Sequence, residues 1–577
     1  MLLCKNRTHN NGELTIKNVG EIVELKGWCA KKRNLGSLVF IDIRDKYGIT
    51  QLRCNEALTD IASQIKNEYV IYAKGVVVER ESKNKNISTG DIEIDVSELK
   101  IINASEQPPI YITDDVDAVS ENVRLKYRYL DLRRKSMQDI LRLRHNITRS
   151  VRSYLDSLDF IEVETPILGK STPEGARDYL VPSRVHNGTF YALPQSPQIF
   201  KQLLMVSGLE RYYQLARCFR DEDLRADRQP EFTQIDVEMS FVDLETLYSV
   251  FEGMFRKIFK DIKGVDNLEF PRLTWKQAMD TYGSDKPDLR YDLKLIDLTE
   301  VFKNTTVEFI KDKCVKAIVV KNAMNEFTRK EIDKLAELAK LFKAKGLCWV
   351  KVNNGTLEGG SAKLISETEI PLFKQATGCE NNDLVLFVAD EWLTSVNAMG
   401  QVRIAVAKKL NLANPNDYKF LWVTEFPMYE YNDDGSLTAM HHPFTAYIEE
   451  DEQYIDSDPL KVRSNAYDLV LNGYELGSGS VRIYNQDMQR KVFERLGLTE
   501  DDINNKFGFF VEALKYGTPP HMGMGFGLER ICMILAGTSN IKDVVAFPKV
   551  QSAADLMNDC PSVVEESALD ILGIKVK

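Results

Sequence analysis

Residues 219–236 read Phe219-Arg220-Asp221-Glu222-Asp223-Leu224-Arg225-Ala226-Asp227-Arg228-Gln229-Pro230-Glu231-Phe232-Thr233-Gln234-Ile235-Asp236. An apolar strand runs into mostly charged residues and then directly into a second strand, which is the pattern of a hairpin. Because successive side chains of a strand point to opposite faces, the second strand separates into two sets. One set is Ile235, Val237, Met239 and Phe241, and the other is Phe232, Gln234, Asp236 and Glu238. We expect the first set to pack in the core and the second to form a binding site; the alternative is a solvated hairpin with surface ion pairs.

The length and composition are those of an ordinary globular protein with several domains. The chain has 577 residues, 44% of them hydrophobic and 28% charged, and at about 150 residues per domain it should hold three or four domains. No apolar run approaches the roughly 20 residues of a membrane span, and residues 1–7 are too short an apolar start for a signal peptide. We therefore expect a cytoplasmic protein without a membrane segment.

Cysteine, histidine and net charge exclude several classes of protein. The nine cysteines include no Cys-x-x-Cys pair, and the six histidines form neither a His-Glu-x-x-His motif nor a cluster with cysteine. Neither a disulfide framework nor a structural zinc site is expected. The net charge of -11 argues against indiscriminate binding of nucleic acid, so any contact with RNA has to be local.

The first 104 residues predict an OB-type barrel. Strands are expected at Val23–Trp28, Ser37–Asp42, Ile49–Cys54, Tyr69–Glu79 and Ile92–Ile101, with a helix at Leu58–Asn67. Five strands with a helix after the third are typical of this small Greek-key barrel, which often binds single-stranded nucleic acid. Lys31, Lys32 and Arg33 are expected in its first turn, and Phe40 on the next strand is a candidate stacking platform. The alternative is a structural barrel in which Phe40 belongs to the core.

Five further segments are predicted after the barrel. They are a hinge or linker (105–135), a first part of a mixed core (136–284), an inserted α+β domain (285–414), a second part of the core (415–550) and a C-terminal extension (551–577). The linker contains Pro108 and Pro109 and a basic run, and an amphipathic helix is expected at 137–158. The insert holds a Lys-rich helix near 330–345 and no dense functional motif. The fold class is therefore α+β with several domains.

A glycine-rich strand leads into an apolar helix at Gly523-Met524-Gly525-Phe526-Gly527-Leu528-Glu529-Arg530. Glycine at alternate positions allows a flat ring to lie against the backbone. Arg530 falls in the first turn of the helix, where the macrodipole disfavours a cation, so it calls for an anion such as a nucleotide phosphate. The alternative is tight packing of helix on sheet, with Arg530 paired to an acid.

Two acids and an arginine flank a second glycine-rich stretch, Gly477-Ser478-Gly479. Asp468 and Glu475 could hold a magnesium ion that bridges phosphates. Arg482 shares the polar side of its strand with Ser480 and could bind a carboxylate through two parallel hydrogen bonds. The alternative for Arg482 is a structural salt bridge.

A helix that begins near Ser196, with Pro197 at its first position, places Gln198 and Lys201 on one face. Residues 171–178 have the glycine and proline content of a mobile lid, and Glu174 within them could close over an ammonium group.

Three motifs in order make the chain similar to a known family. Phe160-Ile161-Glu162-Val163-Glu164-Thr165-Pro166 resembles motif 1 of the class II aminoacyl-tRNA synthetases, residues 219–232 resemble motif 2, and Gly523–Arg530 resembles motif 3. Over essentially its full length the chain resembles the bacterial-type aspartyl-tRNA synthetases, of class IIb. The resemblance implies a six-stranded antiparallel catalytic sheet, an OB domain that grips the anticodon, an insertion between motifs 2 and 3, and a homodimer formed through motif 1.

The resemblance also implies a reaction: activation of L-aspartate by ATP, with Mg²⁺, to aspartyl-adenylate, followed by transfer to the 3' end of tRNA(Asp). Arg220 and Arg530 are implied as catalytic, and Asp468 and Glu475 as metal ligands. The implied ATP-binding residues are Arg220, Asp221, Glu222, Gln229, Phe232, Glu475, Gly527, Leu528, Glu529 and Arg530. The implied aspartate-binding residues are Glu174, Gln198, Lys201, Arg220, Asp236, His441 and Arg482. The implied anticodon contacts are Arg33, Leu35, Phe40 and Gln51.

The alternatives that share these motifs are an asparaginyl- or lysyl-tRNA synthetase and a non-discriminating ligase that charges both tRNA(Asp) and tRNA(Asn). A tRNA-free ligase that makes asparagine and a non-catalytic RNA-binding protein are two further alternatives. Lys201 and Arg482 offer two cations to one carboxylate, which favours aspartate, because the amide of asparagine would leave both without an anion. Leu35 resembles the enzymes that charge only tRNA(Asp), since relatives that charge both often have histidine there. Arg53, where the family has an aromatic residue, and Met522, where it usually has glycine, depart from the pattern and concern fine specificity.

Overall fold

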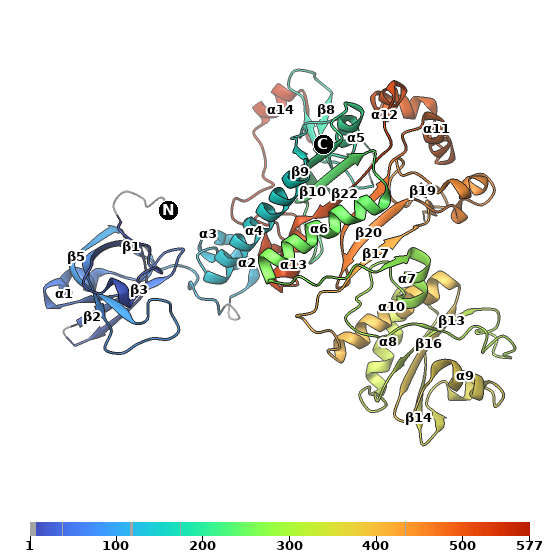
Figure 1. Cartoon of the computed structure of the whole chain (residues 1–577), viewed down its shortest axis with the longest axis horizontal. Helices are drawn as coiled ribbons and strands as arrows, with labels where there is room; N and C mark the ends of the chain where they lie inside the picture. Colours follow the sequence, from blue (N-terminus) through green and yellow to red (C-terminus); the bar gives the residue numbers. More distant parts are fainter. Residues whose placement is uncertain (1–6, 37, 116–118, 173–174, 433) are drawn as a thin grey trace. The chain divides into compact units, whose positions relative to one another are not determined.

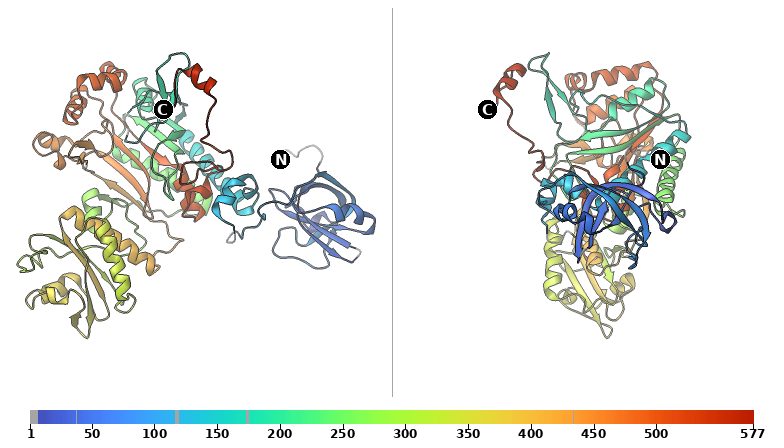
Figure 2. Two further views of the ribbon diagram at one scale, coloured as in Figure 1. Left: turned by 180° about the vertical axis from the view of Figure 1, so that it is seen from behind. Right: turned by 90° about the vertical axis from the view of Figure 1, so that its left-hand side faces the viewer.

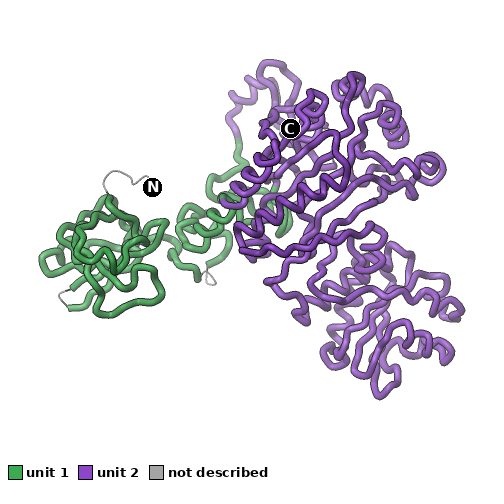
Figure 3. The backbone as a smooth tube through the Cα atoms, in the orientation of Figure 1, with its two compact units in different colours: residues 1–145, 224–229, 540–563 green, residues 146–223, 230–539, 564–577 purple. Residues whose placement is uncertain are grey.

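The computed structural model describes residues 7–36, 38–115, 119–172, 175–432 and 434–577. They form two compact units (Figure 3). Unit 1 contains residues 1–145, 224–229 and 540–563, and unit 2 contains residues 146–223, 230–539 and 564–577. No helix within the described ranges is long and apolar enough to cross a membrane.

Unit 1 begins with a closed five-stranded barrel in the order β1-β2-β3-β5-β4. The elements are β1 (Ile22–Leu35), β2 (Leu38–Arg44), β3 (Ile49–Cys54), α1 (Thr59–Gln64), β4 (Val70–Glu79) and β5 (Ile92–Asn103). Alternate residues such as Val23, Leu25, Ile41 and Ile43 are fully buried inside it, which is the period expected of a barrel wall. The OB-type fold, with its helix after the third strand, is confirmed.

The basic residues at the start of the barrel lie in a strand, not in a turn, and that part of the prediction was wrong. Lys31, Lys32 and Arg33 belong to β1 and pair with Asp42, Ile41 and Phe40 of β2. The strand continues to Leu35 because the hairpin to β2 is tight, with Leu35 directly opposite Leu38. The positive side chains therefore lie along the wall of the barrel.

The rest of unit 1 combines segments that are distant in sequence. The hinge helices α2 (Glu121–Lys126) and α3 (Arg128–Asp131) follow the barrel, and the start of α4 (Lys135–Ser157) ends this part of the unit. The C-terminal segment 540–563 also belongs to unit 1 and contains a short 3-10 turn, Ile541–Val544. Its Ile541 N–H donates to the carbonyl of Ala226, 2.9 Å away, in the charged hairpin loop.

Unit 2 is built on an eight-stranded sheet in the order β11-β17-β20-β21-β22-β10-β9-β6 (Figure 1). Its strands are β6 (Ile161–Glu162), β9 (Arg211–Phe219), β10 (Glu231–Ser240), β11 (Arg272–Thr274), β17 (Phe420–Thr424), β20 (Ala466–Leu471), β21 (Tyr474–Val481) and β22 (His521–Gly527). The six central strands, β17 to β9, pair antiparallel, and β11 and β6 add to the two edges in parallel. The antiparallel catalytic sheet is thus confirmed, with two short edge strands in addition.

Helices α6 and α13 pack against this sheet. Helix α6 (Leu244–Lys263) begins at Asp243, whose side chain accepts from the Thr246 N–H, and ends at Gly264, which adopts a positive φ of 67°. Its Phe251 and Phe255 pack edge-on against Phe526 of β22. Helix α13 (Leu528–Ala536) follows β22 directly, so the glycine-rich stretch is a strand that leads into a helix.

The insert has its own five-stranded sheet, ordered β12-β13-β16-β14-β15 (Figures 1 and 2). The strands are β12 (Ile296–Asp297), β13 (Cys314–Val320), β14 (Cys348–Asn353), β15 (Thr356–Glu358) and β16 (Leu384–Asp390). Helices α8 (Arg329–Leu341) and α10 (Trp392–Lys409) pack on one face, and α9 (Glu369–Thr377) packs on the other. The predicted Lys-rich helix is α8, which a Thr328–Glu331 capping box starts.

The remaining elements of unit 2 surround the catalytic sheet. They are β7 (Leu180–Pro182), β8 (Phe190–Ala192), α5 (Gln198–Val206), α7 (Trp275–Tyr282), β18 (Tyr429–Tyr431), β19 (Leu437–Ala439), α11 (Gln486–Arg495), α12 (Glu500–Ala513) and α14 (Glu566–Leu572). Helix α5 begins at Gln198, so Pro197 is its N-cap and not its first helical residue as predicted. The Pro197 carbonyl accepts from the Lys201 N–H.

The two faces of β10 differ from the expectation at one end. Ile235, Val237 and Met239 are buried as predicted, but Phe241 is 66% exposed. The strand ends at Ser240, and Phe241 adopts a positive φ of 59°, which turns its side chain out of the strand's alternation. On the polar face Asp236 and Glu238 are buried as well, at 1% and 0% exposure, while Phe232 and Gln234 are half-buried. A face of buried carboxylates is unusual for a solvated hairpin and typical of a site.

Candidate active site

An arginine and an aromatic ring meet at the base of the charged hairpin. Strands β9 and β10 pair down to Phe219 and Glu231, and the Arg220 N–H then donates to the Pro230 carbonyl at 2.8 Å. The Arg220 guanidinium lies 5.1 Å from the centre of the Phe232 ring. Its buried Nε has no hydrogen-bond partner among the described residues. A cation with a buried, open donor is a site for an anion.

The hairpin loop is fastened differently at its two ends. At one end the carboxylate of Asp221 lies 3.9 Å from Arg177 Nε, a loose ion pair, and both Asp221 and Glu222 are partly exposed. Gln229, at the other end, belongs to unit 1. Its amide bonds twice to the backbone of Lys549, accepting at 2.8 Å and donating at 3.1 Å.

Two cations meet at one carboxylate in the centre of the sheet. Lys201 of α5 places Nζ 3.3 Å from Glu238 Oε2, and Arg482, just beyond β21, donates to Glu238 through Nε at 2.9 Å and Nη2 at 3.2 Å. All three side chains are nearly completely buried. Burial alone would raise the pKa of Glu238, but Arg482 and Lys201 outweigh it and lower the pKa, so Glu238 is ionised. Lys201 and Arg482, which the sequence analysis paired on a substrate carboxylate, thus both contact one carboxylate of the protein itself.

The structural salt bridge that the sequence left open for Arg482 exists, with Glu238 as its partner. Glu238 is a residue that sequence reasoning placed on the polar face but gave no role. The sequence feature that could have pointed to Glu238 is Gly523. In the structure, a Cβ at this position would lie 2.0 Å from Glu238 Oε2. This glycine makes room for a carboxylate rather than for a flat ring.

Asp236 beside this pair carries an unused hydrogen-bond acceptor. Lys201 Nζ donates to Asp236 Oδ1 at 2.8 Å, while Oδ2 is buried with no partner within the described part of the chain. Burial raises the pKa of Asp236, and Lys201 only partly opposes it. The buried Nε2 of Gln198, at the start of α5, also has no acceptor among the described residues. These open groups match the chemistry of an amino acid: an ammonium group for Asp236 and an acceptor oxygen for Gln198.

Two neighbouring histidines take different places. His441, the residue expected in the pocket, lies with Nε2 3.7 Å from Asp468 Oδ1 and packs edge-on against Phe426. His442, which sequence reasoning missed, has Nε2 2.8 Å from Arg482 Nη1. Burial and the nearby Arg482 charge lower the pKa of His442 well below its ordinary value, so the ring is neutral and can accept from the guanidinium. Only the adjacency of the two histidines hinted at this in the sequence.

The cations and acids expected for the nucleotide lie on adjoining elements. Arg530 of α13 donates from Nη1 to the Glu475 carbonyl at 2.7 Å. Burial and repulsion from Asp468 raise the pKa of Glu475. Two carboxylates that repel each other fit a divalent cation, since Mg²⁺ takes one or two protein carboxylates and completes its shell with phosphate oxygens and water. Asp468 Oδ1 has no hydrogen-bond partner among the described residues, which agrees with this fit.

Lys286 is a further cation here that sequence reasoning missed. Burial would lower its pKa, but attraction to Asp285, Glu475 and Asp468 raises it instead. Its Nζ donates to Asp285 at 3.0 Å. No motif marked it, because it belongs to a loop far from both Asp468 and Glu475 in sequence.

The other residues of the glycine-rich motif have separate surroundings. Glu529 accepts the Thr233 N–H with both carboxylate oxygens, at 3.1 and 3.0 Å, and so joins α13 to β10. Leu528 is buried. A Cβ on Gly527 would meet nothing nearer than 3.9 Å among the described residues, so this glycine keeps a space open beside Arg530. Glu174, the predicted lid residue, lies outside the described residues.

The candidate anticodon residues share the outer wall of the barrel in unit 1. Phe40 is half-buried and lies opposite Arg33 on one side and Arg53 on the other. Gln51 accepts from Arg33 at 2.7 Å and from Arg80 at 2.9 Å, and Leu35 at the hairpin is 66% exposed. Arg53 pairs with Asp95 and Glu93. An aromatic ring between two arginines can stack on a base and attract its phosphate.

The fold and the site together define an enzyme of the class II aminoacyl-tRNA synthetases. The family model of tRNA synthetases class II (D, K and N) matches residues 120–551, and the model of the OB-fold nucleic acid binding domain matches residues 23–102. Solved structures share the fold: an aspartyl tRNA synthetase from Entamoeba histolytica superposes with a TM-score of 0.59 at 19% identity, covering 94% of this chain and 92% of that one.

Full-length relatives narrow the family. An aspartate–tRNA ligase of Macrococcus caseolyticus is 51% identical over 99% of this chain and 98% of its own length. An aspartate–tRNA(Asp/Asn) ligase of Bacillus cytotoxicus is 50% identical over 99% of both chains. The chain belongs to the family of bacterial aspartate–tRNA ligases.

Proposed function

We propose that the chain activates L-aspartate with ATP and ligates it to the 3' end of tRNA(Asp). One observation carries the choice of amino acid: Lys201 and Arg482 converge on the single buried carboxylate of Glu238. The two cations lie against the acids Asp236 and Glu238, and we infer that a substrate carboxylate binds the same two cations. An asparagine amide would bind more weakly than the aspartate carboxylate, because buried cations interact more strongly with a full negative charge than with a neutral amide.

Different residues are proposed to bind the different polar groups of the amino acid. Lys201 and Arg482 hold the side-chain carboxylate, and Asp236 Oδ2 accepts from the ammonium group. Gln198, His441 and Glu174 complete the pocket, while Arg220 reaches the α-carboxylate. His442 and Ser480, 2.8 and 2.7 Å from Arg482 Nη1, keep the guanidinium oriented until substrate arrives. Positioning of this kind supplies much of the rate of an adenylation reaction.

In the first step the aspartate α-carboxylate attacks the α-phosphorus of ATP in line, and pyrophosphate leaves. Arg220 stabilises charge at the α-phosphate, and Arg530 holds the far phosphates. Phe232 takes the adenine on its ring, with Asp221, Glu222, Gln229 and Glu529 around the nucleotide and Gly527 and Leu528 leaving space for it. Asp468 and Glu475 would hold Mg²⁺, which when bound would supply positive charge to the phosphates. In the second step the 3'-terminal adenosine hydroxyl attacks the adenylate carbonyl, the bond to the phosphate breaks and AMP leaves; we assign no protein base to the hydroxyl proton.

The test of this function is a side-by-side assay with purified tRNAs. We expect aspartate-dependent ATP–pyrophosphate exchange and charging of tRNA(Asp), with little exchange driven by asparagine or lysine. Exchange driven by asparagine would overturn the assignment in favour of an asparaginyl enzyme. Equal charging of tRNA(Asn) with aspartate would assign the non-discriminating activity, a second candidate that the name of the Bacillus cytotoxicus relative favours and the exposed Leu35 at the barrel hairpin opposes.

The outer wall of the barrel is proposed to bind the anticodon, and a charge variant tests it. Replacing Lys31 and Arg33 with glutamine is expected to weaken tRNA binding and to reduce the slope of log K against log salt by about 0.7 for each phosphate that is no longer neutralised. Pyrophosphate exchange without tRNA should not change. Lys32 is left intact because its Nζ donates to the carbonyls of Ala62 and Ser63 and holds helix α1.

The matched control is a second pair of lysines on the barrel, Lys74 and Lys100, replaced in the same way. It removes the same charge from β4 and β5 and should leave tRNA affinity nearly unaltered. Equal decreases of affinity in the two double variants, or a decrease of exchange along with binding, would contradict the separate role of the β1–β2 wall.

We further propose a cytoplasmic homodimer formed through motif 1. Strand β6 carries the exposed Ile161 at the edge of the sheet, and Ile167 and Leu168 beyond it are about half exposed. An edge strand flanked by exposed apolar side chains is a surface for self-association. Sedimentation equilibrium of the purified chain measures the association, and a monomer at micromolar concentration would exclude it.

A further inference from the structure

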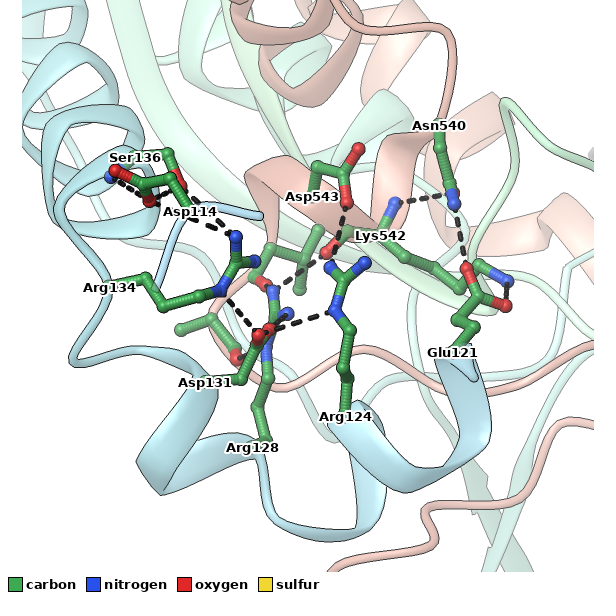
Figure 4. Close-up of polar contacts among 12 residues, drawn as sticks. Asp114, Glu121, Arg124, Arg128, Asp131, Arg134, Ser136, Asn540, Lys542 and Asp543 are labelled. Atoms are coloured by element: carbon green, nitrogen blue, oxygen red, sulfur yellow. Dashed lines mark hydrogen bonds and ion pairs between the residues drawn. The ribbon is translucent and has the colours of Figure 1, made fainter. Parts of the chain in front are cut away.

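A buried arginine in the hinge holds the C-terminal segment of unit 1 (Figure 4). Arg128 is 2% exposed and uses four of its five donors. Nη1 donates to Asp131 at 2.7 Å, Nε to the Ala546 carbonyl, and Nη2 to the carbonyls of Lys542 and Val545, each of these three at 2.9 Å. A planar fork of this kind fixes three carbonyls of one backbone segment at once.

Asp131 orients this arginine through a cluster of three arginines. It is completely buried and also accepts from Arg134 Nε at 2.7 Å and from Arg124 Nε at 3.2 Å. Two outer contacts extend the cluster to the same segment: Glu121 accepts from Asn540 at 2.8 Å and pairs with Lys542. Figure 4 shows Glu121 and Arg124 of α2 beside Asn540, Lys542 and Asp543, with Arg128, Asp131 and Arg134 clustered next to them.

The held segment is the one that carries the tip of the charged hairpin loop. Ile541 donates its N–H to the Ala226 carbonyl at 2.9 Å, immediately beside Lys542. Lys549 makes the two backbone bonds to the Gln229 amide. Residues 541–549 thus bind Arg128 through their carbonyls and the loop 224–229 through the backbone of Ile541 and Lys549.

The barrel is attached to the hinge by a separate contact. Arg133 donates to Glu68 at 2.9 Å and lies over Trp28, and Glu68 is bonded to Arg44 through both oxygens. These bonds involve none of the residues 540–549, so they can be changed while the Arg128 contacts remain.

We propose that Arg128, oriented by Asp131, is a positioning residue that sets the loop 224–229, and with it Gln229, for binding of ATP. The inference rests on the proposed function only in the role of Gln229. The hinge then does more than link the barrel to the core: its buried guanidinium determines the geometry of one end of the nucleotide-binding hairpin.

The test uses the full-length protein and the variant Arg128→Lys. Lysine keeps the charge but offers a single point donor in place of a fork, so the bonds to three carbonyls cannot all be made. We expect amide hydrogen exchange to rise about tenfold or more in residues 541–549 and in the peptide containing residues 224–229, which is the effect of removing one to two charge-assisted bonds. The KM for ATP in pyrophosphate exchange should rise several-fold, with kcat changed less than about twofold.

Two variants make the result decisive. Glu68→Gln removes a buried ionic contact from the same unit and should leave both the exchange of residues 541–549 and the KM for ATP unaltered. Gln229→Ala tests whether the loop itself contributes to ATP binding. If Gln229→Ala raises the KM for ATP but Arg128→Lys does not, the positioning role of Arg128 is overturned. If Gln229→Ala leaves the KM unaltered, the nucleotide role of Gln229 fails, and local exchange alone decides the positioning. Exchange that is unaltered in Arg128→Lys, or raised uniformly across unit 1, also overturns the inference.

Discussion

Replacing Arg482 with leucine is expected to abolish aspartate-dependent ATP–pyrophosphate exchange while leaving ATP binding in place. The guanidinium makes two bonds to Glu238, and we propose it as one of the two cations that bind the substrate carboxylate. Without it, Glu238 keeps Lys201 alone, and the substrate carboxylate would enter a pocket with one cation and two acids. Exchange measured over a wide range of aspartate concentration, together with binding of ATP by calorimetry, checks both halves of the expectation.

Breaking a buried ion pair also costs stability, about 3–5 kcal/mol when one partner is removed. Arg482→Lys therefore accompanies the leucine variant, because it keeps the charge and should fold while still giving up the paired bonds. Arg403→Leu is the matched control: Arg403 is equally buried, at 1% exposure, but donates to carbonyls of the insert, at Leu293, Asp288 and Tyr291. A folded Arg482→Lys with a normal KM for aspartate would contradict the assignment.

Replacing Arg220 with alanine is expected to lower kcat for adenylate formation by about 10²–10³, or roughly 2.7–4 kcal/mol, the usual effect of removing one preorganised charge donor. Arg220 is stacked on Phe232 and has an unpartnered Nε within the described part of the structure, so its donor capacity is available where the α-phosphate and α-carboxylate would meet. Single-turnover formation of the adenylate separates this chemical step from product release.

Arg217→Ala provides the comparison for Arg220. Arg217 lies on β9, which ends one residue before Arg220, but it is partly exposed and bound to Glu231 and Thr233 across the hairpin. Surface pairs of this kind contribute little, about 0–1 kcal/mol, so its removal should change kcat less than about fivefold. Similar decreases in both variants would show that the effect comes from the hairpin's stability and not from charge on the substrate.

The parts of the fold that the sequence predicted are those with local periodicity. The alternation of apolar and polar residues, with a period of two, predicted β10 and the strands of the barrel. The Lys-rich pattern near 330–345 predicted α8. Where charge interrupted the periodicity, prediction was wrong: Lys31 to Arg33 suggested a turn, although their side chains extend from a paired strand. Phe241 continued the alternation in sequence, but the backbone turned before it.

The sequence named candidate residues, and paired Lys201 with Arg482, but it did not give the protein groups that these residues contact. Lys201, Asp236 and Arg482 were each chosen from a motif, but the contact that Lys201 and Arg482 share, Glu238, was not, because these two partners are 37 and 244 residues away in sequence. His442 and Lys286 were missed for the same reason. Their pKa values depend on burial and on charges brought from other elements, which no local pattern records.

By itself, the sequence determined the order of the motifs, the alternating faces of the strands and the type of charge at each position, since these follow from the chain's own periodicity and covalent order. Only the tertiary structure decided which charges meet. It placed Lys201 and Arg482 against one carboxylate, that of Glu238, and placed Gly523 where a side chain would collide with this carboxylate. It also brought Arg128 of the hinge into contact with a segment more than 400 residues away in sequence. Electrostatic energy depends on distance and burial, and both are set only when the strands pack.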